Sequence, residues 1–197
     1  MGVIATRQPP PIGRSELTDV VARARAGDAA AQAALFERFA PSLSGMLARL
    51  LRSVADAEDA LQDTFLVAFE KLDRLHDPAG VEGWLMQIAI FQAHRRFRRR
   101  RFLRLFGLDH AVRDVSLQQL ATPAVAPDVR AELGLLDELL ERLPLVDRVP
   151  WMLRYIEGYE LADVAVACRC SLATAKRRIA AAQARVAAHV KTEDNDG

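Results

Sequence analysis

Residues 55–75 read ADAEDALQDTFLVAFEKLDRL, and this stretch gives the clearest indication of the fold. Its apolar side chains recur at intervals of three and four residues, the spacing that places them on one face of an α-helix. That face consists of Leu61, Phe65, Ala68, Leu72 and Leu75. Asp56, Glu58 and Asp59 stand in the first turn, where the helix dipole favours negative charge. Four further residues lie off the apolar face and are expected to point outward: Gln62, Asp63, Leu66 and Glu70.

An acidic outer face on a core helix is usually only a solvated surface, but the distribution of charge in the rest of the chain indicates that this face binds a partner. The 197-residue chain carries 27 basic and 26 acidic residues, so its net charge of +1 does not steer it towards nucleic acid. The charges are instead segregated, acidic within 56–73 and basic within 95–104. This segregation indicates different partners on different faces of the protein.

The rest of the chain also has helical periodicity, and no segment alternates as a β-strand does. We therefore expect an all-α protein with two helical domains joined by a flexible linker, the C-terminal one being a helix-turn-helix. Hydrophobic residues make up 51% of the chain, which is enough for two cores. The expected parts are a flexible N-terminal arm (1–15), a first helical domain (16–104), a linker (105–129), a second helical domain (130–190) and a disordered tail (191–197).

Within the first domain, capping and breaking residues separate the helices. Asp28 can cap the helix that precedes the acidic one. The segment HDPAGVE (76–82) is expected to be a loop because it contains both Pro and Gly. A fourth helix should begin near Val81–Trp84 and run into the arginine-rich segment RRFRRRR (95–101).

Arginines as dense as those of 95–101 cover much of a helix circumference and repel one another unless a polyanion neutralises them. This segment is therefore expected to contact nucleic acid. Just upstream, Trp84 and Ile88 are expected in the core. Phe91 has two interpretations, a core residue or a surface on which a base stacks.

Residues 160–190 have the pattern of a helix-turn-helix. CRCS (168–171) supplies a short turn, and Ser171 is placed to cap the second helix. That helix then carries the basic cluster Lys176, Arg177 and Arg178. A helix of this size fits the major groove, where its first residues reach base edges and its Lys and Arg reach phosphates. The alternative is an ordinary helical hairpin with a solvated basic face. Arg169 is unusual, because its turn position favours Gly, which tolerates a positive φ.

The residues give no indication of catalysis or metal binding. Cys168 and Cys170 have no further ligands at metal-binding spacing and are better interpreted as small buried residues, and the four His are scattered. The sequence offers neither a nucleophile–base pair nor a phosphate-binding loop, so neither an enzyme nor a cofactor is expected. The N-terminus has no apolar signal region and no run approaches membrane-spanning length, which predicts a cytoplasmic protein that is not embedded in the membrane.

Taken in order, these motifs resemble the extracytoplasmic-function sigma factors of bacterial RNA polymerase over about residues 17–190. DAEDALQDTF (56–65) resembles the family's polymerase-binding motif, and WLMQIA (84–89) with the arginine run resembles the segment that recognises and opens the minus-ten element. Three C-terminal segments resemble the fourth conserved region, which reads the minus-thirty-five element: LPLVDR (143–148), LRYIEGYE (153–160) and SLATAKRR (171–178).

The resemblance implies a function and a set of binding residues. The first domain would bind core polymerase and the minus-ten element, and the second would bind the minus-thirty-five element, in promoter recognition, opening and transcription initiation. The polymerase-binding residues would be Asp59, Gln62, Asp63, Leu66 and Glu70. The minus-ten residues would be Asp77 and Glu82, from a loop that captures a flipped base, together with Phe91, Arg95, Arg98 and Arg99. The minus-thirty-five residues would be Ser171, Thr174, Lys176, Arg177 and Arg178.

Several residues depart from the family's pattern. Phe91 stands where the family usually has Asn, and Arg95 where it has Asp, so the minus-ten preference is expected to be unusual. In the second domain, Ala173 and Arg169 replace common glycines, and Ala181 replaces a frequent basic residue. Pro150 falls after the LeuPro motif and is expected to kink that helix or to delay its start.

The alternative function is a transcription regulator that uses only the helix-turn-helix, but such a protein has no use for a polymerase-docking helix. The resemblance further implies an anti-sigma factor, because one sequesters many members of the family. Two small domains on a flexible linker expose both binding faces, which a helical partner can bury together. The expected partners are therefore core RNA polymerase, promoter DNA and an anti-sigma factor, with no small-molecule substrate.

Overall fold

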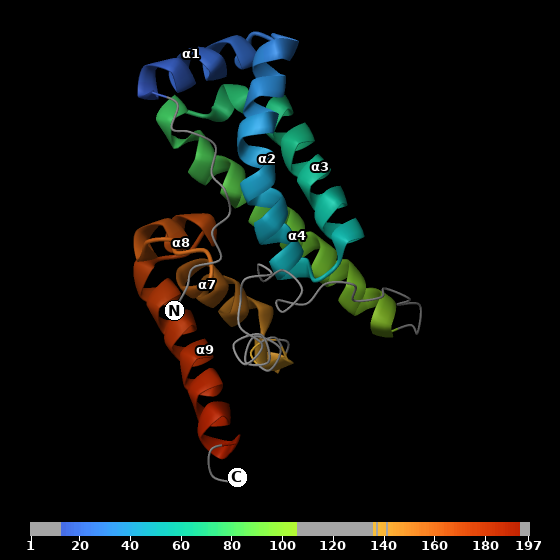
Figure 1. The fold of residues 1–197 in the computed structure, drawn as a ribbon, viewed down its shortest axis with the longest axis vertical. Helices are drawn as coiled ribbons and strands as arrows, with labels where there is room; N and C mark the ends of the chain where they lie inside the picture. The colour runs from blue at the N-terminus through green and yellow to red at the C-terminus, as the bar shows by residue number, and fades with distance from the viewer. Residues whose placement is uncertain (1–12, 106–135, 137, 141, 194–197) are drawn as a thin grey trace, which may run out of the picture. The chain divides into compact units, whose positions relative to one another are not determined.

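The computed structural model describes residues 13–105, 136, 138–140 and 142–193, and the regular structure in these ranges is helical throughout, with no strand (Figure 1). These residues fall into two compact units, one within 5–114 and one within 115–197. The expected all-α fold with two helical domains is therefore confirmed. Residues 1–12 of the predicted arm, the predicted linker at 106–129 and residues 194–197 of the predicted tail lie outside the described residues.

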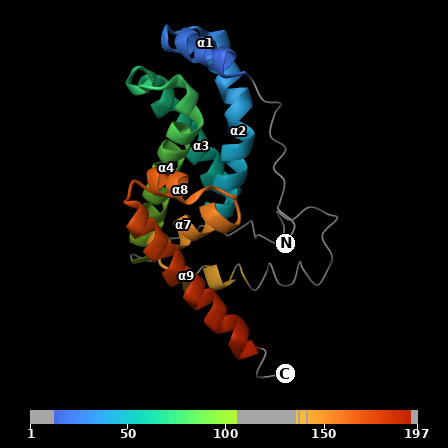
Figure 2. The same cartoon turned by 90° about the vertical axis from the view of Figure 1, so that its left-hand side faces the viewer.

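The N-terminal unit is built on three long helices. They are α2 (Ala29–Leu51), α3 (Val54–Glu70) and α4 (Val81–Leu105), and each contacts the other two (Figures 1 and 2). The first helix, α1 (Arg14–Arg25), packs on α2 and on the short 3-10 turn η2 (Pro78–Gly80). A second 3-10 turn, η1 (Leu72–Arg74), follows α3.

Caps set the helix boundaries in this unit. The Asp28 carboxylate accepts hydrogen bonds from the backbone N–H groups of Ala30 and Ala31, which confirms it as the cap of α2. Ser53 caps α3 in the same way by accepting from the N–H of Asp56, a cap that the sequence analysis did not identify. With both helix starts fixed, α3 follows α2 after only a short turn.

The core residues of this unit are mostly large and aliphatic on α2 and α4, whereas on α3 they are small except for Phe65. Leu47 and Leu50 from α2 and Met86 from α4 are almost fully buried, and full burial of such a side chain contributes about 1.5–3 kcal/mol. The innermost residues of α3 are Ala57, Ala60, Thr64, Phe65 and Ala68.

The predicted apolar face of 55–75 is thus only partly right. Phe65 and Ala68 are buried as expected, whereas Leu61 is only half-buried. Leu72 and Leu75 are buried too, but α3 ends at Glu70, so they reach the core from η1 and the residue after it. A regular spacing of apolar residues continued past the point where the helix stopped.

The C-terminal unit packs α7 (Leu145–Tyr155) and α8 (Leu161–Ala167) against α9 (Leu172–Glu193). Its buried residues include Val149, Leu153, Val164, Ala175, Ile179, Ala182 and Val186. The expectation that Pro150 delays the start of its helix is wrong, because α7 begins at Leu145 and contains Pro150 as a buried residue. The last helix also continues to Glu193, three residues past its expected end.

Candidate functional site

The outer face of α3 combines apolar and polar side chains. Gln62 and Glu70 are exposed, and the Leu66 side chain is 62% exposed. The ring of the adjacent residue Phe65 packs on Phe36 of α2, with ring centroids 4.7 Å apart, and Phe36 itself is 43% exposed. Exposed apolar side chains supported by buried aromatic rings are characteristic of a protein-binding surface.

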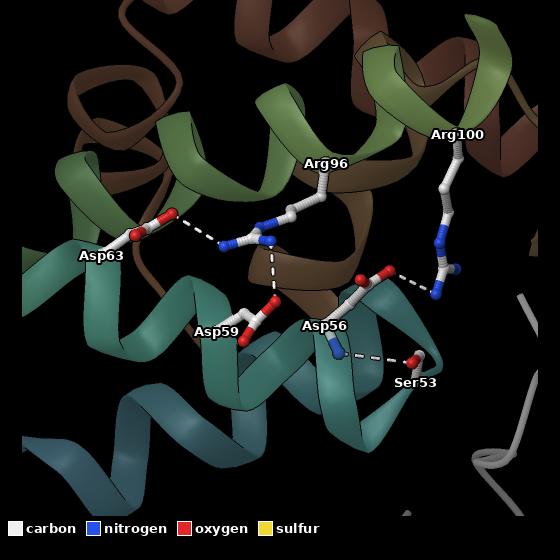
Figure 3. A network of polar contacts seen from close by, with 6 residues as sticks. All are labelled: Ser53, Asp56, Asp59, Asp63, Arg96 and Arg100. Atoms are coloured by element: carbon white, nitrogen blue, oxygen red, sulfur yellow. Dashed lines mark hydrogen bonds and ion pairs between the residues drawn. The ribbon is translucent and has the colours of Figure 1, made fainter. Parts of the chain in front are cut away.

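Two of the acidic residues expected on that face are engaged by the arginine-rich helix. Arg96 donates through Nη1 to Asp59, at 2.9 Å, and through Nη2 to Asp63, at 2.7 Å (Figure 3). Asp63 is therefore half-buried and paired rather than free at the surface. The expectation that Asp63 points outward is therefore only partly right.

A second pair of charges continues this contact. Arg100 forms an ion pair with Asp56 and also donates to the backbone carbonyl of Leu51, at 3.1 Å (Figure 3). Residues later in α4 thus meet residues earlier in α3, so the two helices run antiparallel. We call the five charged residues the α3–α4 ion bridge: Asp56, Asp59, Asp63, Arg96 and Arg100.

The ion bridge divides the arginine run in two. The side chains of Arg96 and Arg100 are only 13% and 10% exposed, whereas Arg95, Arg98 and Arg99 are exposed. The expectation that the whole run needs a polyanion to neutralise it is therefore wrong for two of its members, which acidic residues of the same domain neutralise. Among the described side chains of the run, Arg95, Arg98 and Arg99 leave a basic outer face on α4.

Phe91 lies on the exposed side of α4. Its side chain is 48% exposed, which excludes the interpretation of Phe91 as a core residue. Ile88, one turn earlier, is buried as expected, while Trp84 is only half-buried. Phe91 and the exposed Arg95 are four residues apart and so lie on neighbouring turns of one helix face.

The segment expected to be a loop contains the turn η2. The exposed Asp77 caps this turn, because its Oδ1 accepts from the N–H of Ala79 at 3.0 Å, and Glu82 is exposed at the start of α4. Arg25 of α1 holds the preceding segment by donating to the carbonyls of Leu72, at 3.3 Å, and Leu75, at 2.7 Å. Sequence reasoning missed Arg25, which no motif marks.

The helix-turn-helix has the expected geometry. Ser171 Oγ accepts from the N–H of Thr174 at 3.2 Å and lies 2.9 Å from the Thr174 hydroxyl, so both hydroxyls are engaged at the start of α9. Arg169 has a φ of 49°, the left-handed conformation expected of that turn. Among the basic residues of α9, Lys176 and Arg177 are exposed and Arg178 is half-buried.

Both cysteines of the turn are half-buried, so the expectation that they are buried residues is only partly right. Burial, followed by the neighbouring Cys170, raises the pKa of the Cys168 thiol to about 12, against a smaller lowering by Arg178. Both thiols are free. Among the described residues, no three His, Cys, Asp or Glu side chains lie close enough to hold a metal ion. None of the helices in the same ranges has the length and apolar character needed to cross a membrane.

Comparison with known proteins identifies both halves of the chain. The family Sigma-70 region 2 matches residues 35–102, and the family Sigma-70, region 4 matches residues 133–186. The chain is 31% identical over 192 residues to the ECF RNA polymerase sigma factor SigM of Mycobacterium tuberculosis, covering 91% of this chain and 92% of SigM. It is 32% identical over 158 residues to the RNA polymerase sigma factor CarQ of Myxococcus xanthus, covering 79% and 81% of the two chains.

A solved structure has the same fold. CnrH in complex with the cytosolic domain of CnrY superimposes with a TM-score of 0.63 at 21% identity, covering 88% of this chain and 96% of that one. The match to region 2 excludes a regulator built on the helix-turn-helix alone. This chain therefore belongs to the sigma-70 family of RNA polymerase sigma factors, in its extracytoplasmic-function (ECF) group, as a non-enzymatic initiation factor that directs promoter recognition and transcription initiation.

Proposed function

We propose that this sigma factor docks on core polymerase through the outer face of α3. The supporting observation is that the Leu66 side chain is 62% exposed. An apolar side chain in this position does not contribute to the core of its own domain and is available to a partner. Gln62 and Glu70 flank it and supply polar contacts. Asp59 and Asp63 form the edge of this surface, next to the arginine helix.

The minus-ten element is bound by the outer face of α4 and by the segment before it. Arg95, Arg98 and Arg99 would neutralise phosphates, and the exposed Phe91 ring offers a surface on which an unstacked base can stack. Asp77 and Glu82 lie at either end of the turn that would receive a flipped base. Because Phe91 cannot donate or accept hydrogen bonds, base preference there should depend on stacking.

The minus-thirty-five element is read by the start of α9. Ser171 and Thr174 hold the helix N-terminus in shape and lie beside the bases, while Lys176, Arg177 and Arg178 follow on the next turn. Arginine suits paired contacts to guanine in the major groove, and lysine suits phosphate. The chain would act in the cytoplasm, where both DNA and polymerase are found.

An anti-sigma protein would hold the factor inactive until it is needed. CnrH, which shares the fold, was solved in complex with the cytosolic domain of CnrY. If a partner of this kind binds here, the factor expressed alone should transcribe its target promoters strongly, and co-expression with the partner's gene should suppress this transcription. Low activity of the factor alone, relieved only by a modification, would contradict sequestration.

Run-off transcription with core polymerase tests the docking proposal, with start sites mapped by sequencing. Leu66→Arg places a charge on the docking face and should lower affinity for core polymerase about tenfold or more, as expected when a central apolar contact is lost. Ala22→Arg adds the same charge at an exposed position of α1 and should leave affinity unchanged. Equal affinities for the two variants would show that the outer face of α3 is not the docking surface.

A further inference from the structure

The α3–α4 ion bridge lies between the two proposed interfaces of the N-terminal unit. On one side, α3 presents Gln62 and Leu66 outward, and on the other, α4 presents Arg95 and Arg98. Figure 3 shows Arg96 reaching from α4 to two carboxylates of α3, with Arg100 reaching to a third. Two of the acidic residues that the resemblance assigns to polymerase binding, Asp59 and Asp63, thus also hold the DNA-binding helix.

The inner side of α4 changes character along its length. Leu85, Ala89 and Ala93 are buried apolar residues that pack the first half of the helix into the core. At the next two inner positions, one and two turns later, stand Arg96, whose side chain is half-buried, and Arg100, which is buried. At these positions the half of α4 that carries the exposed arginines meets α3 through charge pairs, where the first half uses apolar packing.

Arg96 is built to fix the rotation of α4. Its two terminal nitrogens donate to carboxylates one helical turn apart on α3, so rotation of α4 about its axis would stretch both contacts together. Rotation would also redirect Arg95 and Arg98, which stand on the same turns. The direction of the basic outer face is consequently tied to the position of the Arg96 guanidinium.

We propose that Arg96 is a positioning residue for promoter binding, and that Asp59 and Asp63 act by holding Arg96 instead of by touching polymerase. This inference rests on the proposed function of the two outer faces. It adds Arg96 to the functional residues, although Arg96 contacts neither DNA nor polymerase. It also changes the role of Asp59 and Asp63 from direct to indirect.

A charge exchange separates positioning from direct contact. Asp63→Arg alone sets two guanidinium groups against each other and should lower both core affinity and the affinity of the holoenzyme for promoter DNA, each by about tenfold or more. Adding Arg96→Glu rebuilds the pair in reverse. Asp59, which also pairs with Arg96, then lies near the carboxylate introduced at position 96, and the new arginine at position 63, four residues from Asp59 on the same helix, can pair with both carboxylates.

Positioning predicts that the double variant recovers both affinities to within about twofold of the wild type, the spread of neutral surface substitutions. Recovery of thermal stability without core binding would mean that Asp63 itself touches polymerase. Recovery of core binding without promoter binding would mean that Arg96 itself touches DNA. Either result overturns the inference. Glu58→Arg, an equal charge change at an exposed position of α3, should behave like the wild type.

A neutral pair keeps the test decisive if the reversed pair does not fold. Asp63→Asn with Arg96→Gln retains hydrogen-bonding groups and removes the charges, and positioning predicts that core binding survives in any variant that folds. Loss of core binding at unchanged melting temperature would overturn the inference. A failure of the proposed function itself gives a different result: Leu66→Arg would then leave core binding unaffected, and Arg98→Glu would leave promoter binding unaffected. In that case the inference about Arg96 would be wrong as well.

Discussion

The basic helices of the two domains use their charge in opposite ways. In α4, Arg96 and Arg100 turn inward to pair with acidic residues of α3, whereas Arg95, Arg98 and Arg99 face outward. In α9, a seam of Ala175, Ile179 and Val186 holds the helix, so Lys176 and Arg177 are left at the surface. In a run of arginines, the members that pair with acidic residues of the same domain must therefore be identified first, and only the exposed members can be assigned to nucleic-acid binding.

The two attachments also differ in energy. Apolar burial stabilises in proportion to the area removed from water, whereas a buried ion pair must first offset the loss of hydration of both charges. Removing one partner of such a pair is costly, since it leaves the other charge unpaired. The end of α4 is consequently the more vulnerable of the two basic helices.

The largest expected effect is from Arg100→Met, which keeps most of the side-chain volume but removes the charge. It leaves Asp56 without its partner and the Leu51 carbonyl without its donor. We expect the free energy of unfolding of the N-terminal unit to fall by about 2–4 kcal/mol, measured by urea denaturation. The neighbouring Arg99 is exposed, so Arg99→Met should change it by less than about 0.5 kcal/mol. Equal losses would show that the ion bridge does not stabilise the domain.

The next effect concerns the other basic helix. Arg177→Ala removes an exposed side chain, so folding should be unaffected. If Arg177 reads a base edge, discrimination at one or two base pairs of the minus-thirty-five element should fall by about 1–3 kcal/mol. The measurement is binding to promoter fragments that differ at single positions. A uniform loss over all fragments would assign Arg177 to phosphate.

Local signals predicted most of the helices. Asp28 as a cap, Ser171 as a cap and the left-handed turn at Arg169 were all expected from residue type alone and are confirmed. Each of these features is decided by a residue and its immediate neighbours. The order of the motifs likewise predicted the family correctly.

Features that depend on the packing of distant segments were not predictable in this way. Which arginines of α4 face α3 depends on the rotation of one helix against another, and periodicity in α4 alone did not reveal it. The same holds for Phe91, for which the sequence left both a core and a surface position open and which the structure shows to be exposed. Arg25 donates to the carbonyls of Leu72 and Leu75, which are 47 and 50 residues away in the sequence, and no local sequence pattern predicts such a contact.

A smaller effect is expected at the turn of the helix-turn-helix. Arg169→Gly relieves the left-handed backbone at this position, where a side chain is unfavourable. We expect the C-terminal unit to gain roughly 0.5–1 kcal/mol of stability, less than the αL penalty itself because Gly also gains freedom in the unfolded chain. Thermal unfolding of the wild type and of the Arg169→Gly variant measures this difference in stability. A loss of stability would mean that the Arg169 side chain makes a contact worth more than the backbone strain.

The smallest expected effect is a dependence on pH in the same unit. Because the pKa of Cys168 is raised from 9.0 to about 12, the thiol ionises in the unfolded chain at a lower pH than in the folded one. Its contribution is intact below pH 9 and is lost as pH rises towards 12. Between pH 8 and 9, wild-type stability should fall by about 0.4 kcal/mol more than that of Cys168→Ala. Parallel pH profiles for the two proteins would contradict this.

The division of the arginines in α4 is tested most directly by the salt dependence of promoter binding by the holoenzyme. The slope of log affinity against log salt counts the phosphate contacts that are made. Arg98→Gln should reduce the slope by about one contact, whereas the charge-exchanged variant Asp63→Arg with Arg96→Glu, which keeps the ion pair that positions α4, should leave the slope unchanged. If the charge-exchanged variant reduces the slope as much as Arg98→Gln does, Arg96 contacts phosphate in the complex and the division described here is wrong.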